Sequence, residues 1–400
     1  MLGEVRDSNR NVSWALVIGA SRKEEVGRRQ SGDAVLSEAA WPCHRPFFSF
    51  RLPPFASRLM KVLTTRQLNR ALLARQMLLE RSAAPITRVL DRMGGLQAQY
   101  APAIYIGLWS RMAGLERARV TEALERRTIV QGTMMRSTIH VVSARDYWPL
   151  MLATDQARRQ WFARVYRGPH TEADFAAASE TVRSLLGSGP QPRAVLVEAV
   201  GNDLWAGVHV DMVRVPPSGT WERRRADLYG LAEHWITPTA ITGEVGLEWL
   251  IRRYLGGFGP ALATDIGTWA GMPIDRIVPV LERMGLRRFR AEDGKELVDV
   301  NRLPLPDADV AAPIRFLPVW DAILLVHARR KAVIGEEHRP IIFNTKLPQS
   351  MPTFMVDGSV AGTWKYADGE VKLAPFDVIP RKWKRELEEE AKALAAFHNQ

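Results

Sequence analysis

The sequence has 400 residues, and 55 Lys and Arg against 44 Asp and Glu give it a formal net charge of +11. Ordinary proportions of apolar (46%) and charged (25%) residues exclude a wholly disordered or fibrous chain, and the length predicts two to four folded units. No run of about 18 apolar residues occurs, so we expect no membrane-spanning helix. The single cysteine, Cys43, excludes disulfides within the chain and cysteine-rich metal sites, and it suits a reducing cytoplasm.

The basic residues are mostly arginine, because only ten of the 55 are lysine. The isoelectric point near 10.0 lies above the value of about 9 at which a nucleic-acid partner is suspected. The nucleotide composition of the genome is an alternative cause of the arginine excess, but it does not explain the net positive charge. We therefore expect a cytoplasmic protein associated with the nucleoid.

Residues 1–60 differ from the rest of the chain, because they lack a sustained helical period and contain a proline-rich stretch over residues 41–54. We expect a loosely ordered N-terminal extension. Met60 stands just before the first convincing helix, so translation could also start there, which N-terminal sequencing of the native protein would test.

Residues 61–150 are expected to form the first folded unit. Thr64 and Gln67 make a capping-box pattern that predicts a helix start, and Gly94-Gly95 is expected to end a second helix. Residues 128–142 are rich in β-branched side chains and contain one glycine, which predicts a pair of strands. Helices followed by a small hairpin are the order of a winged helix.

A second unit over residues 151–250 is expected to follow the same order. Residues 211–215 and 220–223 flank Pro216-Pro217-Ser218-Gly219, and this pattern predicts a hairpin. Such a hairpin would be a second wing.

The third unit, residues 251–303, has the clearest pattern. Helices are predicted over residues 264–270 and 274–284, with a turn at Gly271-Met272-Pro273 between them. Asp293-Gly294 is a favoured hairpin turn. This order predicts a helix-turn-helix with a wing, although an αα-hairpin without a role in nucleic-acid binding fits it as well.

Residues 304–400 are expected to form a β-rich C-terminal region that ends in a helix over residues 381–397, which makes the fold class α+β. Asp-Gly turns at residues 357–358 and 368–369 separate strand-like runs and predict a small sheet or barrel. The runs are residues 314–318, 322–326, 340–343, 353–356, 360–365 and 371–373.

Two segments, Gly95-Leu96-Gln97-Ala98-Gln99 and Met135-Arg136-Ser137-Thr138-Ile139-His140, carry a family resemblance together with Trp109 between them. The sequence resembles the winged-helix DNA glycosylases of the AlkZ type, which act on alkylated purines and interstrand crosslinks. Further similar segments follow at residues 219–221, 317–321 and 354–364, so the resemblance runs from about residue 62 to the C-terminus. It implies tandem winged-helix units, three in this chain, around a basic concave surface that binds double-stranded DNA.

The family signature is Gln, an apolar residue, then Gln, so the resemblance implies that Gln97 and Gln99 are catalytic. Ala98 is a small version of the middle residue, and Ser137 stands where many relatives have glycine. An N7-alkylated purine already carries positive charge, so it leaves without the strong acid that sugar hydrolases need. Two amides on one side could orient a water molecule and hold the departing base. Positions two apart share a face in an extended segment but diverge on a helix, so we expect Gln97 and Gln99 in non-helical backbone.

Candidate DNA contacts are the basic side chains near the expected wings. They are Arg136, His140, Arg214, Arg223, Arg224 and Arg225. For His140 a structural role is the alternative. His209 and Asp211 lack a third ligand, so we expect no metal site and no cofactor.

Three hypotheses of function remain open at this point. The first is a monofunctional, monomeric glycosylase that acts on damaged DNA and leaves an abasic site, because no lysine has a clear activating neighbour for a lyase step. The second is a winged-helix transcription regulator, and the third is a binder that protects lesions without cutting. Release of 7-methylguanine from DNA would distinguish the first from the other two.

Overall fold

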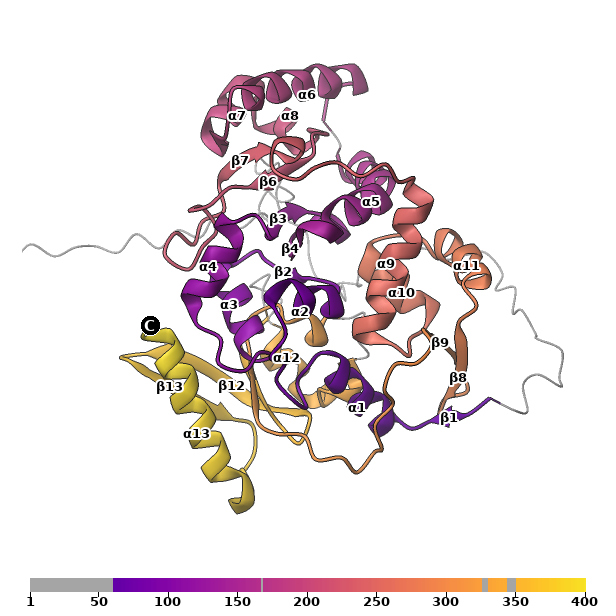
Figure 1. The fold of residues 1–400 in the computed structure, drawn as a ribbon, viewed down its shortest axis with the longest axis vertical. Helices are drawn as coiled ribbons and strands as arrows, with labels where there is room; N and C mark the ends of the chain where they lie inside the picture. Colours follow the sequence, from indigo (N-terminus) through magenta and orange to yellow (C-terminus); the bar gives the residue numbers. More distant parts are fainter. Residues whose placement is uncertain (1–59, 167, 326–329, 344–349) are drawn as a thin grey trace, which may run out of the picture. The chain divides into compact units, whose positions relative to one another are not determined.

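The computed structural model describes residues 60–166, 168–325, 330–343 and 350–400. They form a mixed α+β fold, as predicted (Figure 1). The extension expected over residues 1–60 lies, apart from Met60, outside the described residues. Within these ranges no helix combines the length and the apolar character that a membrane span requires.

The described chain begins with strand β1 (Val62–Leu63) and helix α1 (Thr65–Arg75). The Thr64 hydroxyl accepts a hydrogen bond from the backbone N–H of Gln67 at 3.1 Å, and Gln67 Oε1 accepts one from the Thr64 N–H at 3.0 Å. The predicted capping box is therefore confirmed.

The next segment runs helix, short strand, two helices and two strands. Its elements are α2 (Ile86–Met93), β2 (Leu96–Gln97), α3 (Ala101–Trp109), α4 (Arg117–Glu125), β3 (Ile129–Thr133), the 3₁₀ turn η3 (Met135–Ser137) and β4 (Ile139–Ser143). Strand β4 lies between β2 and β3 and is antiparallel to both. The strand pair predicted over residues 128–142 is confirmed.

After helix α5 (Ala144–Val165), the chain repeats this order. The elements are α6 (Glu172–Gly187), β5 (Gln191–Pro192), α7 (Arg193–Val200), α8 (Asn202–Ala206), β6 (Met212–Arg214), β7 (Leu228–Leu231) and the 3₁₀ turn η4 (Ala232–His234). Strand β7 lies between β5 and β6, and β6 also pairs with β3. The two segments therefore share one six-stranded sheet in the order β2-β4-β3-β6-β7-β5.

The hairpin predicted around Pro216-Pro217 is wrong. Strand β6 pairs with β7, which starts at Leu228, and residues 220–223 form no strand. The Ser218 hydroxyl donates to the carbonyl of Arg225 at 2.6 Å and accepts from the N–H of Asp227 at 2.7 Å. These bonds between a side chain and the backbone hold residues 219–226 in a loop, because they replace the partners that a strand would need.

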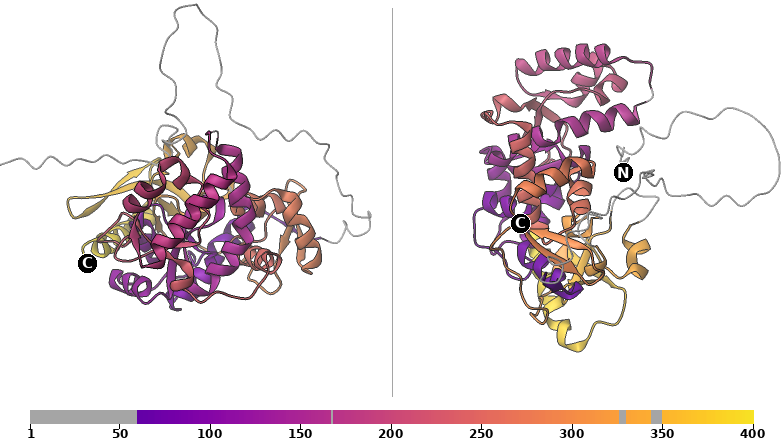
Figure 2. Two further views of the ribbon diagram at one scale, coloured as in Figure 1. Left: turned by 90° about the horizontal axis from the view of Figure 1, so that it is seen from above. Right: turned by 90° about the vertical axis from the view of Figure 1, so that its right-hand side faces the viewer.

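A third segment follows the same order with a single bridge in place of the short strand. Its elements are α9 (Gly243–Phe258), α10 (Ala263–Ala270), α11 (Ile274–Arg283), β8 (Arg287–Ala291) and β9 (Glu296–Asp299). Ala261 forms an antiparallel bridge to Val298, and β1 pairs in parallel with β8. The two helices and the hairpin predicted here are confirmed, and α9 packs along α5 (Figures 1 and 2).

The C-terminal region is a four-stranded antiparallel sheet with a helix against it (Figure 1). Its elements are β10 (Arg315–Leu317), β11 (Thr353–Val356), β12 (Ser359–Ala367), β13 (Glu370–Pro375) and α13 (Arg381–His398), with the 3₁₀ turns η5 (Ala322–Leu324), η7 (Arg330–Ala332) and η8 (Glu336–His338) and helix α12 (Arg339–Ile342) between them. The four strands and the final helix confirm four of the six predicted runs and the terminal helix.

Two predicted strands in this region are wrong. Residues 322–324 form η5 because the Asp321 carboxylate accepts a hydrogen bond from the N–H of Ile323 and caps the turn. Residues 339–342 form α12, which carries Pro340 in its first turn, a favoured position for proline in a helix.

The predicted division into units at residues 150, 250 and 303 stays a prediction. The limits at residues 150 and 250 each fall within a helix, because α5 runs through residue 150 and α9 runs through residue 250.

Buried arginine–aspartate pairs join distant parts of the chain. Arg75 on α1 donates to both carboxylate oxygens of Asp299 on β9, at 2.7 and 2.9 Å, and both side chains are almost fully buried. Arg111, just after α3, makes the same two-pronged contact with Asp321 at 2.8 and 2.8 Å. Each pair excludes water and fixes two segments more than 200 residues apart.

Asp299→Ala is expected to destabilise the fold by about 3–5 kcal/mol, because it leaves the buried Arg75 guanidinium without its counter-charge. Urea denaturation measures the change. Glu122→Ala, which removes an exposed ion pair with Arg126 on α4, is the matched control and should cost less than about 1 kcal/mol. Equal losses in the free energy of unfolding of the two variants would show that the buried pair stabilises the fold no more than an exposed one.

Candidate active site

Two glycines direct the chain from helix α2 into strand β2. Gly94 ends the helix with φ +75°, and Gly95 follows with φ +83°. A Cβ atom on Gly95 would lie 2.7 Å from Val142 Cγ1 and 2.9 Å from the Val141 carbonyl oxygen. Only glycine allows both this left-handed backbone and this close approach to β4.

Strand β2 and the residues after it alternate between the core and the opposite side. Leu96 (3% exposed) and Ala98 (1%) pack into a core cluster with α3, whereas Gln97 and Gln99 are half-buried. The Ala98 N–H donates to the Ile139 carbonyl at 2.7 Å, so the segment stays extended past the end of β2. The expected non-helical backbone is confirmed, and the alternation indicates that Gln97 and Gln99 share the face away from Leu96 and Ala98.

The Gln97 amide is held by the Arg136 guanidinium. Arg136 Nη2 donates to Gln97 Oε1 at 3.1 Å, and its Nη1 donates to the Trp269 carbonyl at 2.5 Å. Burial lowers the pKa of Arg136 to about 10, so the side chain stays charged at neutral pH. Both ends of the guanidinium are thus engaged within the protein, and the DNA contact expected of Arg136 stays a prediction.

The Gln99 amide has an open acceptor. Its Oε1 atom is buried and has no hydrogen-bond partner within the part of the chain that the structure describes. A buried acceptor without a partner costs about 1–3 kcal/mol, so such atoms usually serve a solvent molecule or a substrate. Gln97 and Gln99 therefore differ in what each can offer: the first has a fixed oxygen and the second a free one.

The arginines of residues 223–225 lie beside this motif. All three are exposed, and Arg224 Nη1 donates to the Tyr100 hydroxyl at 3.2 Å. Tyr100 follows Gln99 directly and is 39% exposed. Arg225 also pairs with Asp227 at 3.2 Å. The fold thus brings an exposed basic loop to the glutamine motif, although the loop is not the wing that was predicted.

Arg214 and His140 are buried, which corrects their assignment as DNA contacts. Arg214 is 7% exposed and donates to Thr133 Oγ1 at 2.8 Å and to the Tyr229 hydroxyl at 3.3 Å. His140 is 2% exposed, and its Nδ1 lies 3.0 Å from the Thr138 carbonyl. Burial, together with the charge of Arg136, lowers the pKa of His140 to about 3, so the ring is neutral and supports the sheet instead of meeting a phosphate.

A charged cluster that the sequence did not single out holds α2 just before the motif. The Asp91 carboxylate accepts from Ser143 Oγ at 2.6 Å and from Arg145 Nη2 at 3.0 Å. The Asp146 carboxylate accepts from Arg253 Nη2 on α9 and from Trp249 Nε1, at 2.7 and 3.0 Å. No sequence signal marked this cluster, because helical spacing places Asp91 away from the face that Val89, Leu90 and Met93 share.

Potential metal ligands are the acidic, histidine and cysteine side chains. In the ranges that the structure covers, no group of three or more His, Cys, Asp or Glu side chains is arranged to hold a metal ion. His209 lies against the Phe162 ring, and Asp211 pairs with Arg158 at 3.8 Å.

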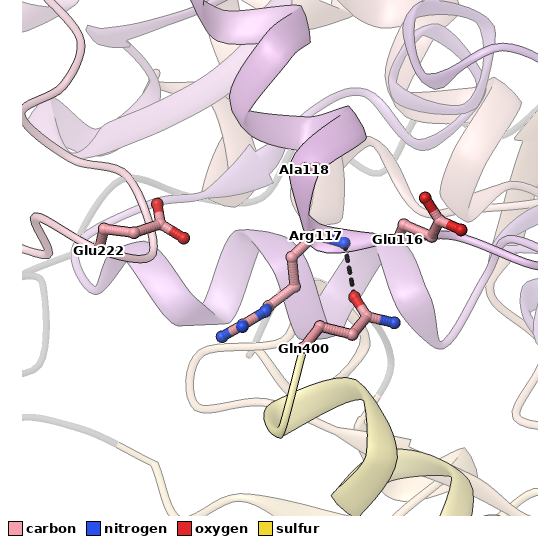
Figure 3. A pocket seen from close by; sticks show the side chains of 5 residues that line it. All are labelled: Glu116, Arg117, Ala118, Glu222 and Gln400. Atoms are coloured by element: carbon pink, nitrogen blue, oxygen red, sulfur yellow. Dashed lines mark hydrogen bonds between the residues drawn. The ribbon is translucent and has the colours of Figure 1, made fainter.

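A pocket of about 260 Å³ lies at the start of α4, and neither Gln97 nor Gln99 lines it (Figure 3). Gln400 Oε1 accepts the Arg117 backbone N–H there at 2.8 Å. Two carboxylates, Glu116 and Glu222, line the pocket with Arg117, Ala118 and Gln400, so it does not suit a polyanion such as DNA.

Comparison with known proteins gives concordant matches. Residues 90–397 match the family described as DNA glycosylase AlkZ-like. An interstrand DNA cross-link repair glycosylase from Streptomyces sahachiroi is 24% identical over 357 residues, which covers 80% of this chain and 93% of that protein. The solved structure of the Streptomyces sahachiroi DNA glycosylase AlkZ matches with a TM-score of 0.69 at 18% identity, over 84% of this chain and 97% of that one. At this identity the structural match shows a shared fold.

His140→Gln is expected to flatten the acid side of the stability profile. An unfolded histidine has a pKa near 6.5 and the folded one about 3, so the unfolded state binds one more proton between these values. Stability therefore falls as the pH drops through this window, by up to about 1.4 kcal/mol per pH unit. Urea unfolding of both proteins between pH 4 and 6 measures the difference, and parallel profiles would contradict a neutral, buried His140.

Proposed function

The chain belongs to the AlkZ-like family of DNA glycosylases, and from this premise we propose that it hydrolyses the N-glycosidic bond of N7-alkylated purines in duplex DNA. The observation that carries the proposal is the pair Gln97 and Gln99 on one face of an extended segment, with a free acceptor on Gln99 and an exposed basic loop beside it. The relative from Streptomyces sahachiroi acts in interstrand cross-link repair, so we extend the proposal to unhooking crosslinked purines.

The reaction needs little acid assistance. When the bond between C1′ and N9 breaks, its electron pair neutralises the cationic base, and water adds to C1′ and releases one proton to solvent. The Asp91 and Asp146 carboxylates, on α2 and α5, are already bound by arginines, so they are poorly placed to act as general acids. The Gln99 oxygen can accept a hydrogen bond from the attacking water and direct its lone pair to the sugar.

We propose a monofunctional enzyme that leaves an abasic site. A lyase step needs an amine that attacks C1′ to form a Schiff base. The sequence contains no lysine between residues 62 and 294, the range that holds the glutamine motif and the basic loop.

We also propose that the three segments of like order are three winged helices around a basic concave surface. In each segment the last strand (β4, β7 or β9) lies in the middle. It pairs with the strand before it on one side and with the short strand, or in the third segment the bridge at Ala261, on the other. Two helices directly precede the final strand pair. Three such units in one chain can cover a length of duplex without the dimer that a regulator of this fold generally needs, so we propose a monomer.

Gln99→Ala is expected to lower the single-turnover rate of base release on the order of 100-fold, because the water loses the acceptor that orients it. Gln97→Ala should also slow release. The substrate is a duplex with one 7-methylguanine, and hot alkali converts each abasic site into a strand break. Gln160→Ala, which removes an exposed glutamine on α5, is the control and should keep the wild-type rate. Binding without strand breaks by the wild-type protein would contradict the proposed reaction.

Arg223→Ala and Arg225→Ala are expected to weaken binding to any duplex and to reduce the slope of log K against log salt concentration by about 0.9 for each lost phosphate contact. Fluorescence anisotropy from 50 to 200 mM salt measures the slope. Arg385→Ala on α13, whose side chain is 90% exposed and far along the chain, is the matched loss of one positive charge. An unchanged slope in both loop variants would show that the loop does not touch the backbone of DNA.

A further inference from the structure

We infer that Arg136 is a positioning residue that fixes the orientation of the Gln97 amide, so that Gln97 presents a hydrogen-bond donor to the substrate while Gln99 presents an acceptor. This inference rests on the proposed function, because it assigns different tasks to the two glutamines of the same site. It assigns Arg136 a different task from the DNA contact that we expected from the sequence.

The orientation follows from the chemistry of the guanidinium. An arginine side chain has five N–H donors and no acceptor, so the atom of Gln97 that faces it at 3.1 Å must be the oxygen. The NH₂ group of Gln97 then points away from Arg136. A glutamine amide that lacked such a partner could turn over at little cost and present either group.

Arg136 is itself held firmly. Its second terminal nitrogen donates to the carbonyl of Trp269 at the end of α10, where the helix dipole favours a positive charge. The backbone of Arg136 has φ +54°, and a Cβ on Gly271 would lie 3.0 Å from its Cα. The turn at Gly271 therefore packs directly on the Arg136 backbone, and the Trp269 carbonyl holds the guanidinium in place.

The two glutamines then match the two ends of the breaking bond. As the cationic base departs, electron density flows to its nitrogen and oxygen atoms, which become better acceptors for the Gln97 NH₂ group. The Arg136 charge polarises the Gln97 amide and strengthens this donor. The Gln99 oxygen is left for the attacking water, which must donate a proton into a hydrogen bond while its lone pair faces C1′.

The test compares Arg136→Ala and Arg136→Lys with wild type on a duplex that contains one 7-methylguanine. We expect Arg136→Ala to lower the single-turnover rate at saturating enzyme on the order of 100-fold, with the dissociation constant and its salt slope unchanged. Arg136→Lys should recover part of the rate, because lysine can still donate to the Gln97 oxygen. A near-normal rate together with a salt slope reduced by about 0.9 would instead make Arg136 a phosphate contact and overturn the inference.

Gln97→Glu tests the donor directly and does not depend on how well the Arg136 variants fold. The carboxylate can still accept from Arg136 but has no N–H for the base, so we expect a loss as large as in Gln97→Ala. Wild-type release by Gln97→Glu would overturn the inference and leave the proposed function standing. No release by the wild-type protein would instead contradict the proposed function itself.

Discussion

The candidate active site depends on one guanidinium that joins two separate segments of the fold. Arg136, in the turn between β3 and β4, binds both the Gln97 side chain on β2 and the last turn of α10 in the third segment. The backbone of the glutamine motif is held by its sheet and by the core around Leu96 and Ala98, whereas this contact holds the Gln97 side chain. With it, the position of Gln97 is set by the third segment as well, so the chemistry of the first segment depends on how the third one packs.

Part of the arginine excess serves the interior. Arg70, Arg75 and Arg111 are among the largest fully buried side chains, and each binds an aspartate from a distant part of the sequence. The motif at residues 317–321, which contributed to the family resemblance, owes its aspartate to this role, since Asp321 binds Arg111 and caps η5. Trp221 of the motif at residues 219–221 packs on Tyr105 and Phe397. Both motifs therefore hold the fold together, and neither belongs to the glutamine pair to which we assign the proposed chemistry.

Local signals in the sequence predicted the elements that local forces determine. The capping box at Thr64, the left-handed stop at Gly94 and the hairpin at Asp293-Gly294 all depend on residues within a few positions of each other. The prediction failed at the loop after Pro216, where Ser218 binds residues seven to ten positions ahead. This failure reflects contacts beyond the reach of a local signal, whereas the strands predicted at η5 and α12 failed because a local cap and a local proline favour a turn and a helix there.

The same limit applies to the candidate site. The extended backbone of Gln97 and Gln99 followed from their spacing, but the burial of His140 and Arg214 did not, because both faces of β4 and β6 are covered at these positions. Nor could the sequence show that Arg136 meets Trp269, which lies 133 positions further on. Such contacts depend on how distant segments pack together, which charge patterns and motifs do not reveal.

The pairing of β3 with β6 limits how the proposed enzyme can accommodate lesions of different size. Gln131 pairs with Arg214 and Gly132 with Val213. Backbone hydrogen bonds therefore join the half of the sheet that carries the glutamines to the half from which the basic loop emerges. The distance between the glutamines and the basic loop is therefore fixed by the sheet. In the function proposed above, a bulky adduct would have to be accommodated by distortion of the duplex, since the two halves of this sheet cannot separate without breaking these hydrogen bonds.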